Sequence, residues 1–173
     1  GDISLNDKVI VSEKSWRMGG SQMFLEVRDE VKVEDLLYGI AVVSGNDACV
    51  SIAEAIAGSE ELFVKWMNDK AISLGLNNIK FTDVHGLSED NRITAYEYAV
   101  LVNHYLHDHP DAIKYHSKTS FGYQPRSSST PIVQPNRNGL LGKYEGADGL
   151  KTGFLTKAGY NLIATAKQGD RRL

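Results

Sequence analysis

The stretch that decides the fold reads VEDLLYGIAVVSGNDACVSIAEAIAG and runs from residue 33 to residue 58. Its first part repeats apolar side chains at the spacing of a helix with one buried face, at Val33, Leu36, Leu37, Ile40 and Ala41. Gly45 interrupts this pattern, and a second apolar helix through Ile52 and Ile56 ends at Gly58. Ser44 is therefore predicted to lie between two buried helices.

Shorter elements are expected upstream of this stretch, and another helix downstream. Two strands are predicted at Lys8 to Val11 and at Met23 to Val27, separated by a glycine loop. Ser59, standing before a pair of glutamates, predicts the cap and acidic first turn of a helix. The apolar face of that helix is predicted to place Trp66 and Met67 in the core.

The C-terminal half changes from helix to strand patterns. Thr94 followed by Glu97 forms a capping-box pattern at the start of a helix. Residues 124–134, rich in serine with two prolines, predict an exposed loop or the end of a hairpin. Residues 147–154 and 160–166 predict two strands joined by a turn, and residues 171–173 begin a third. We therefore expect an α/β (α+β) fold with an antiparallel sheet.

Composition narrows the classes of function. A chain of 173 residues suits one compact domain or a large part of one, and a net charge of −3 argues against a nucleic-acid partner. The lone Cys49 excludes an internal disulfide and a thiolate metal site, and its place in an apolar stripe favours a buried, unreactive thiol. No apolar run in the sequence reaches the length of a membrane span.

Two short motifs carry residue types suited to acyl transfer, namely Ser44-Gly45-Asn46 and Lys151-Thr152-Gly153. Each motif alone is weak, because Ser-Gly-Asn is ordinary turn chemistry and Lys-Thr-Gly can end any edge strand. Their order, and their places at a helix end and on a hairpin strand, make a shared active site the better interpretation. A Ser-x-x-Lys motif, which would supply an acylated serine, occurs nowhere in the 173 residues.

With their flanks, these motifs resemble the low-molecular-mass penicillin-binding proteins, specifically the serine-type D-alanyl-D-alanine carboxypeptidases of the DD-peptidase and serine β-lactamase superfamily. The similar segments follow in the same order along the chain: LYGI at 37–40, SGNDAC at 44–49, TDVHGL at 82–87, NRNGLL at 136–141, DGLKTG at 148–153 and KAGYNL at 157–162. The resemblance implies a transpeptidase-type fold, with a helical region and an antiparallel sheet that has helices on both faces.

The same resemblance implies what lies beyond the chain. The family's Ser-x-x-Lys would precede Gly1, and further sheet strands would follow Leu173. We therefore expect residues 1–173 to be a partial catalytic domain, truncated at both ends and inactive by itself.

The resemblance also assigns catalytic roles to Ser44, Asn46 and Lys151. Ser44 would relay a proton toward the leaving amine as the scissile bond breaks. Asn46 would hold the penultimate amide of the substrate and orient the lysine of the Ser-x-x-Lys motif. Lys151 would supply a positive field and attract the terminal carboxylate of the substrate.

Substrate binding is assigned to Lys151, Thr152, Gly153 and Phe154. Thr152 would donate a hydrogen bond to the substrate carboxylate, and Gly153 would leave room for a substrate along the strand edge. The backbone N–H of Phe154 would be the second donor to the oxyanion. Several family members have histidine where this chain has Phe154, and a main-chain donor survives that change.

The activity implied is removal of the terminal D-alanine from peptidoglycan stem peptides through an acyl-enzyme, with β-lactams as inhibitors and no cofactor or metal. The place implied is extracytoplasmic, in the periplasm or at the outer face of the cytoplasmic membrane, with membrane attachment only through a segment outside this chain. Two alternatives stay open. One is a β-lactamase of the same superfamily, although class A enzymes typically have Ser-Asp-Asn and a glutamate-bearing loop. The other is a non-catalytic relative.

The remaining polar residues receive weaker interpretations. His85 is predicted to be a hydrogen-bonded structural residue of a loop. The histidines at 104, 107 and 109 suggest a metal site only by proximity, because no carboxylate or thiol pattern completes one. Arg137 either orders the sheet edge near the pocket or pairs on the surface.

Overall fold

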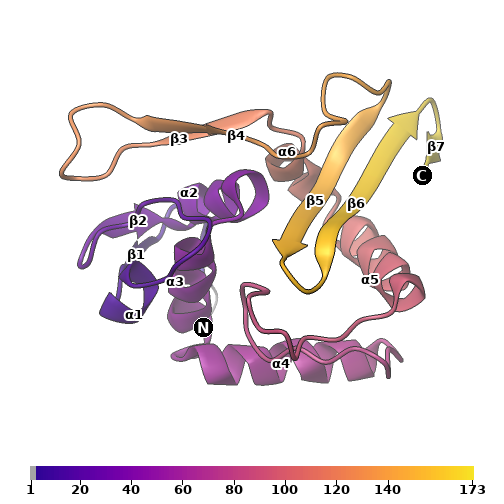
Figure 1. Cartoon of the computed structure of the whole chain (residues 1–173), viewed down its shortest axis with the longest axis horizontal. Helices are drawn as coiled ribbons and strands as arrows, with labels where there is room; N and C mark the ends of the chain where they lie inside the picture. Colours follow the sequence, from indigo (N-terminus) through magenta and orange to yellow (C-terminus); the bar gives the residue numbers. More distant parts are fainter. Residues whose placement is uncertain (1–2) are drawn as a thin grey trace.

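The computed structural model describes residues 3–173 and shows a mostly helical first half with one short strand pair, followed by two β-hairpins (Figure 1). The first half of the chain contains β1 (Lys8–Ile10), α1 (Glu13–Trp16), β2 (Glu30–Lys32), α2 (Val33–Tyr38), the π-helical turn η1 (Gly39–Val43), α3 (Asn46–Ala57) and α4 (Glu60–Ser73). The second half contains α5 (Ala95–Asp108), the 3₁₀ turn η2 (Pro110–Ala112), α6 (Ile113–His116), β3 (Ser120–Tyr123), β4 (Ile132–Pro135), β5 (Ala147–Leu155), β6 (Gly159–Gln168) and β7 (Arg171–Arg172). The predicted α+β class is confirmed.

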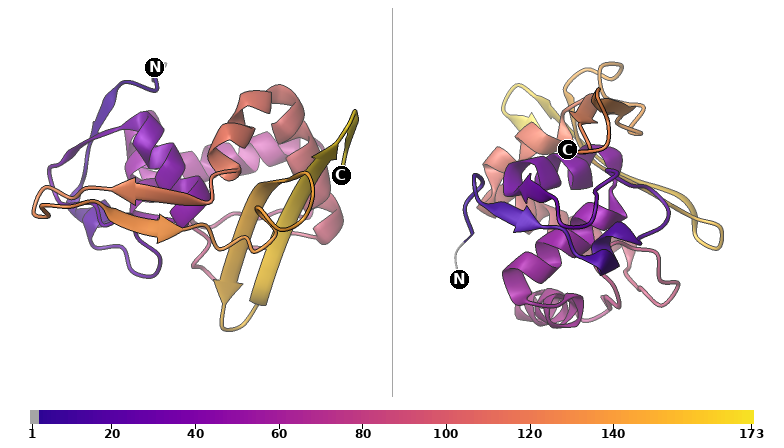
Figure 2. Two further views of the ribbon diagram at one scale, coloured as in Figure 1. Left: turned by 90° about the horizontal axis from the view of Figure 1, so that it is seen from above. Right: turned by 90° about the vertical axis from the view of Figure 1, so that its left-hand side faces the viewer.

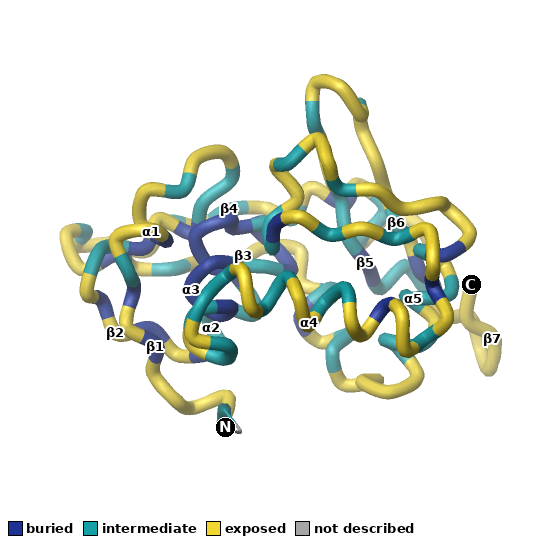
Figure 3. Tube along the Cα trace, turned by 90° about the horizontal axis from the view of Figure 1, so that it is seen from below, coloured by how far each residue is buried: buried dark blue, intermediate teal, exposed yellow. Residues whose placement is uncertain are grey.

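The core lies where α2 and α3 pack against the β1–β2 pair. Its buried side chains are Val9, Val11, Met23, Leu25, Val31, Val33, Leu36, Ala48 and Ile52. In Figure 3 the buried stretches gather around these elements, whereas the end of the chain at β7 is exposed. The sequence places both helices correctly, and α3 ends as predicted at Gly58, whose φ of +83° suits a residue without a Cβ.

The strand predicted at Met23 to Val27 is wrong. The partner of β1 is instead β2, with Val9 opposite Val31 in an antiparallel register. The N–H groups of Met23 and Leu25 donate to the carboxylate of Asp47 rather than to a neighbouring strand. Phe24 between them has a φ of +65°, which breaks an extended strand. The apolar alternation in this segment therefore reflects burial without strand pairing.

The prediction that Trp66 belongs to the core is also wrong. The Trp66 side chain is 44% exposed and Met67 is half-buried, and the buried residue of α4 is Ala71. The helix lies along the lower side of α3 in Figure 1 and contacts it. Periodicity identifies the inward face of a helix, but the depth of burial depends on what packs against that face.

Both predicted helix caps form, but the capping box expected at Thr94 forms only in its first half, because the Glu97 carboxylate bonds to another loop. The Ser59 side chain accepts a hydrogen bond from the N–H of Leu62, and that of Thr94 accepts one from the N–H of Glu97. The Glu97 carboxylate is buried and accepts from the N–H groups of Asn77 and Asn78. Glu97 therefore connects the start of α5 to the loop that follows α4.

The C-terminal half forms two hairpins, of which the sequence predicts the second as two strands joined by a turn. In the first, residues 124–131 are the predicted hairpin end, but residues 132–134, predicted as part of the same loop, belong to strand β4. Strands β3 and β4 pair antiparallel and are joined by residues 124–131. Figure 2 shows this hairpin extending across the helical core, and Phe121 and Tyr123 of β3 pack against that core. Strands β5, β6 and β7 form a three-stranded sheet in that order, with Lys151 opposite Ile163. Helix α6 packs on β5 and brings this three-stranded sheet to the helical half.

Among the described residues 3–173, no helix combines the length and apolar character required to cross a membrane.

Candidate active site

The two motifs meet in space although they lie far apart in the sequence. The Nζ atom of Lys151 donates a hydrogen bond to Oγ of Ser44 at 2.6 Å and another to the carbonyl oxygen of Thr152 at 2.7 Å. Ser44 comes from the end of η1 and Lys151 from β5. The candidate site is therefore formed where the β5-β6-β7 sheet meets the helical core.

Backbone geometry places Ser44 at this junction. Its φ of 64° and ψ of 35° lie in the left-handed region, which is uncommon for a residue with a side chain and turns the chain sharply between η1 and α3. Gly45 follows in a crowded position, where a Cβ would lie 2.9 Å from Oδ1 of Asp47 and 3.2 Å from the nitrogen of Met23. A glycine between Ser44 and Asn46 is therefore required by packing.

Asn46 is the first residue of α3 and only 4% exposed. Its Nδ2 donates to the carbonyl oxygen of Gly19 at 2.7 Å, and its backbone N–H donates to that of Ser21 at 2.8 Å. The Gly19 to Ser21 loop is thereby fixed to the start of α3. The family resemblance assigns Asn46 to the penultimate amide of a substrate, and in this structure its side-chain nitrogen is engaged by that loop.

The electrostatic environment of Lys151 is unusual for a lysine. Burial lowers its pKa below the ordinary lysine value, and the positive charge of Arg137 lowers it further. Arg137 therefore influences the site electrostatically, whichever surface partner it has. Burial also raises the pKa of the Cys49 thiol to about 12, so this thiol is protonated and uncharged at neutral pH.

The other predicted binding residues follow Lys151 along β5. Thr152 is half-buried, whereas Gly153 is exposed and a Cβ added to it would meet no heavy atom within 4 Å. Phe154 is 55% exposed and lies opposite Tyr160 on β6, with 4.6 Å between the ring centroids. The strand beyond Lys151 is thus open to a ligand and ends in an aromatic pair.

Two residues next to the site were missed by sequence reasoning. Nδ2 of Asn138, which is 3% exposed, donates to the carbonyl oxygen of Gly149 at 2.9 Å. Nδ1 of His116 lies 3.1 Å from the carbonyl oxygen of Leu150. Asn138 belongs to the NRNGLL segment and could have been suspected, but no pattern in the sequence singles out His116.

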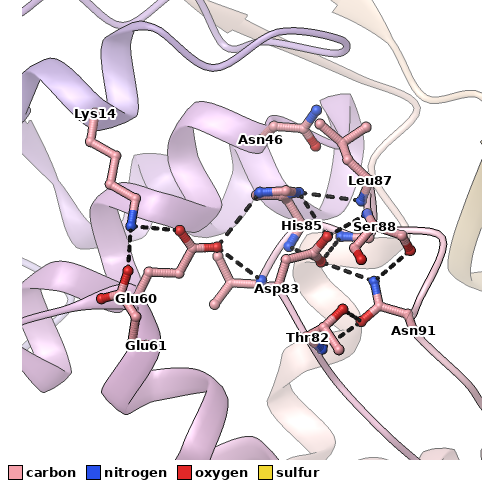
Figure 4. A network of polar contacts seen from close by, with 12 residues as sticks. Lys14, Asn46, Glu60, Glu61, Thr82, Asp83, His85, Leu87, Ser88 and Asn91 are labelled. Atoms are coloured by element: carbon pink, nitrogen blue, oxygen red, sulfur yellow. Dashed lines mark hydrogen bonds and ion pairs between the residues drawn. The ribbon is translucent and has the colours of Figure 1, made fainter.

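His85 is a hydrogen-bonded loop residue, as predicted. Its Nδ1 accepts from the N–H of Leu87 at 3.3 Å, and its Nε2 lies 3.6 Å from a carboxylate oxygen of Glu60 at the start of α4 (Figure 4). The loop is built around Asp83, whose carboxylate accepts backbone N–H groups of residues 85, 86 and 88. Burial of Asp83 raises its pKa, but hydrogen bonds from Ser88 and Gly86 outweigh that effect and lower the pKa overall.

Metal ligation has no obvious site in the described residues 3–173, where no group of three or more His, Cys, Asp or Glu side chains is arranged to hold an ion. His107, one of the three histidines considered from the sequence, is exposed and lies 3.1 Å from the carboxylate of Asp108.

Comparison with known proteins gives a consistent family. The chain matches the family described as D-alanyl-D-alanine carboxypeptidase over residues 1–173. It is 43% identical over 178 residues to the D-alanyl-D-alanine carboxypeptidase DacF of Bacillus subtilis (strain 168), covering 99% of this chain and 44% of that protein. It is 42% identical over 179 residues to DacC of Escherichia coli (strain K12), covering 99% of this chain and 43% of that protein. The chain thus spans less than half the length of these curated relatives.

Solved structures agree with the sequence comparison. Penicillin binding protein 6B from Escherichia coli superposes with a TM-score of 0.90 at 42% identity, covering 98% of this chain and 54% of that chain. Penicillin binding protein 5 from Haemophilus influenzae superposes with a TM-score of 0.90 at 39% identity, covering 98% of this chain and 49% of that chain. The fold implied by the sequence motifs is therefore confirmed.

Proposed function

The chain belongs to the D-alanyl-D-alanine carboxypeptidase family, and we propose that the whole protein is a serine-type D-Ala-D-Ala carboxypeptidase. It would remove the terminal D-alanine from peptidoglycan stem peptides, and residues 1–173 would be part of its catalytic domain. One observation carries the proposal, namely the 2.6 Å hydrogen bond between Lys151 and Ser44 at a junction open along β5.

The reaction would proceed in two steps. A serine of the Ser-x-x-Lys motif, which residues 1–173 do not contain, attacks the carbonyl carbon of the penultimate D-alanine and forms a tetrahedral oxyanion. The C–N bond then breaks, D-alanine leaves with a proton on its amine, and an acyl-enzyme remains. Water hydrolyses that ester and regenerates the serine. No cofactor or metal takes part.

Ser44 is well placed for the proton transfer. Because the Lys151 ammonium donates to Oγ of Ser44, the hydroxyl hydrogen of Ser44 is free to point elsewhere. We assign Ser44 the delivery of a proton to the leaving amine nitrogen. Lys151 orients that hydroxyl and replaces its proton, and the lowered pKa of Lys151 makes such a transfer less costly than from an ordinary lysine.

Substrate recognition would use the edge of β5. The positive charge of Lys151 attracts the terminal carboxylate, and the hydroxyl of Thr152 donates to it. The substrate backbone lies beside Gly153, where no side chain intrudes, and the N–H of Phe154 donates to the oxyanion. Asn46 would bind the penultimate amide, which requires its Nδ2 or its amide oxygen to face the substrate while it holds the loop at Gly19.

The proposed partners are peptidoglycan stem peptides ending in D-Ala-D-Ala, and β-lactams, which acylate the same serine as substrate mimics. The enzyme would act outside the cytoplasm, in the periplasm or at the outer face of the membrane, because its proposed substrate is the cell wall.

The test uses the full-length protein and measures two reactions, release of D-alanine from a peptide and formation of a covalent adduct with penicillin. Release of D-alanine from a peptide ending in D-Ala-D-Ala is expected, with a peptide ending in D-Ala-L-Ala as the control. Penicillin should form an adduct that persists in intact-mass spectra. Rapid penicillin hydrolysis without peptide cleavage would instead indicate a β-lactamase, and neither reaction would indicate a non-catalytic relative. The polypeptide of residues 1–173 alone should take no adduct, because it contains no Ser-x-x-Lys.

A further inference from the structure

The start of β5 is held by side chains from outside its sheet. Strand β5 is at one edge of the order β5-β6-β7, so its outer backbone groups need partners other than a strand. The carbonyl oxygen of Leu150 faces Nδ1 of His116, at the end of α6, across 3.1 Å. Leu150 is the residue directly before Lys151, so this contact lies one peptide unit from the lysine of the proposed site.

The second nitrogen of His116 also has a partner. Nε2 lies 2.9 Å from the hydroxyl of Tyr105 on α5, and the two rings are nearly perpendicular with centroids 5.7 Å apart. A carbonyl oxygen can only accept a hydrogen bond, so Nδ1 of His116 carries the hydrogen. In a neutral ring, Nε2 then accepts from the Tyr105 hydroxyl, and this fixes the Nδ1–H tautomer.

The surroundings of the ring favour the neutral form. Burial lowers the pKa of His116, and the nearby positive charge of Lys151 lowers it as well, whereas the hydrogen bond to Leu150 opposes them. The groups that face the ring are thus Tyr105 from α5 and Leu150 and Lys151 from β5. A neutral His116 holds the strand without placing a second positive charge beside Lys151.

Packing at Gly149 brings the strand against His116. A Cβ added to Gly149 would lie 3.3 Å from Cβ of His116 and 3.3 Å from a methyl carbon of Thr165. The backbone of β5 therefore approaches α6 as closely as a residue without a side chain allows. Contact at Gly149 and the hydrogen bond at Leu150 fix two successive residues of β5 relative to α6.

We propose that His116 is a positioning residue for Lys151, which acts through the hydrogen bond to the carbonyl oxygen of Leu150. The carbonyl oxygens of Leu150 and Thr152, two residues apart, lie on the same side of the strand. The first meets His116 and the second accepts from Nζ of Lys151. His116 thereby fixes the strand edge along which Lys151 reaches Ser44, and the role rests on the proposed function of that pair.

The proposal predicts a specific loss when the donor is removed. In the full-length protein, the limiting rate of acylation by a fluorescent penicillin should fall roughly 10- to 100-fold in His116→Leu, because small displacements of a catalytic group carry large kinetic costs. The half-saturating penicillin concentration should change much less. His116→Asn keeps a donor at the position of Nδ1 and should stay within about threefold of the unmodified protein.

The matched pair separates positioning from stability. Both variants lose the ring and the contact with Tyr105, so both should lower the melting temperature, but only His116→Leu should lose acylation. Equal losses in the two variants would refute the donor role, and so would an unchanged rate in a folded His116→Leu protein.

A second measurement needs no variant. Nitrogen-15 NMR of the His116 ring at neutral pH should show hydrogen on Nδ1 and an unprotonated Nε2. A ring with hydrogen on Nε2 would overturn the proposal even if His116→Leu does not fold. If the unmodified full-length protein takes no penicillin, the proposed function fails, while the ring tautomer still decides whether His116 holds Leu150.

Discussion

The helical core and the β5–β6 hairpin supply the two halves of the site by different means. Asn46 on the core side is 4% exposed, and the neighbouring Asp47 is 1% exposed. On the hairpin side, Phe154 is 55% and Tyr160 is 90% exposed. The core side is therefore buried throughout, whereas the hairpin is packed at Leu150, which is 5% exposed, and opens to solvent beyond Lys151. Substitutions in the core should cost stability, and those in the hairpin should cost activity.

Asp47 shows how the core half is held. Its Oδ1 accepts the N–H groups of Met23 and Ala48, each at 2.9 Å, and its Oδ2 accepts that of Leu25 at 3.1 Å. Its carbonyl oxygen accepts from the buried hydroxyl of Ser15 at 2.8 Å. One residue of the SGNDAC segment thus organises the loop before α2 and the start of α3.

The largest expected effect is a loss of activity without a loss of stability, at Lys151 on the hairpin. In the full-length protein, Lys151→Ala should reduce penicillin acylation at least about 100-fold, because it removes the charge and the donor to Ser44. Its melting temperature should stay near that of the unmodified protein. Lys167→Ala, an exposed lysine on the neighbouring strand, is the control and should keep full activity. Unchanged labelling of Lys151→Ala would remove this residue from the site.

The second-largest expected effect is a loss of stability in the helical core. Asp47→Ala should lower the free energy of unfolding by about 3 kcal/mol, because three N–H groups lose a buried acceptor. Denaturant titration measures this change, and Asp69→Ala, on the exposed face of α4, should cost less than about 1 kcal/mol. A small loss in Asp47→Ala would show that packing alone holds the core half of the site.

The pH dependence of acylation separates the function of Lys151 from its effect on stability. Because burial lowers the pKa of Lys151, acylation should start to decline with rising pH below the ordinary lysine value of about 10.4, and by roughly tenfold per pH unit once that lowered pKa is passed. The lowered pKa means that the unfolded chain binds more protons, so this group makes the fold more stable as pH rises through that window. The alkaline decline is then a loss of function without unfolding.

The control for this profile is Lys151→Arg, which stays charged throughout and should move the decline in its remaining activity to higher pH. An alkaline limb at the same pH in both proteins would mean that another group titrates.

The smallest expected effect concerns Phe154. Phe154→His keeps the backbone N–H that is proposed to donate to the oxyanion, so kcat/KM near neutral pH should change by no more than about threefold. The new imidazole is exposed, so it should add a dependence on pH between about 5 and 8. A tenfold loss would show that the Phe154 ring itself contacts the substrate.

Sequence reasoning succeeds where local backbone chemistry decides the structure. The caps at Ser59 and Thr94 and the stop at Gly58 depend on hydrogen bonds and dihedral angles within a few residues. It fails at Met23 to Val27, where a carboxylate remote in sequence takes the N–H groups that a strand would have used. It fails at Trp66 because burial depends on neighbours, which periodicity does not specify.

The four long helical stretches, the β5–β6 hairpin and the pairing of the two motifs follow from the sequence, because their spacing and flanks are written along the chain. The 2.6 Å approach of Ser44 and Lys151, and the residues that hold them there, depend on how distant segments pack. His116 and Asn138 act on backbone carbonyl groups, which every residue has, so their partners leave no pattern in the sequence. Such contacts exist only once α6 and the loop between β4 and β5 have packed against the start of β5.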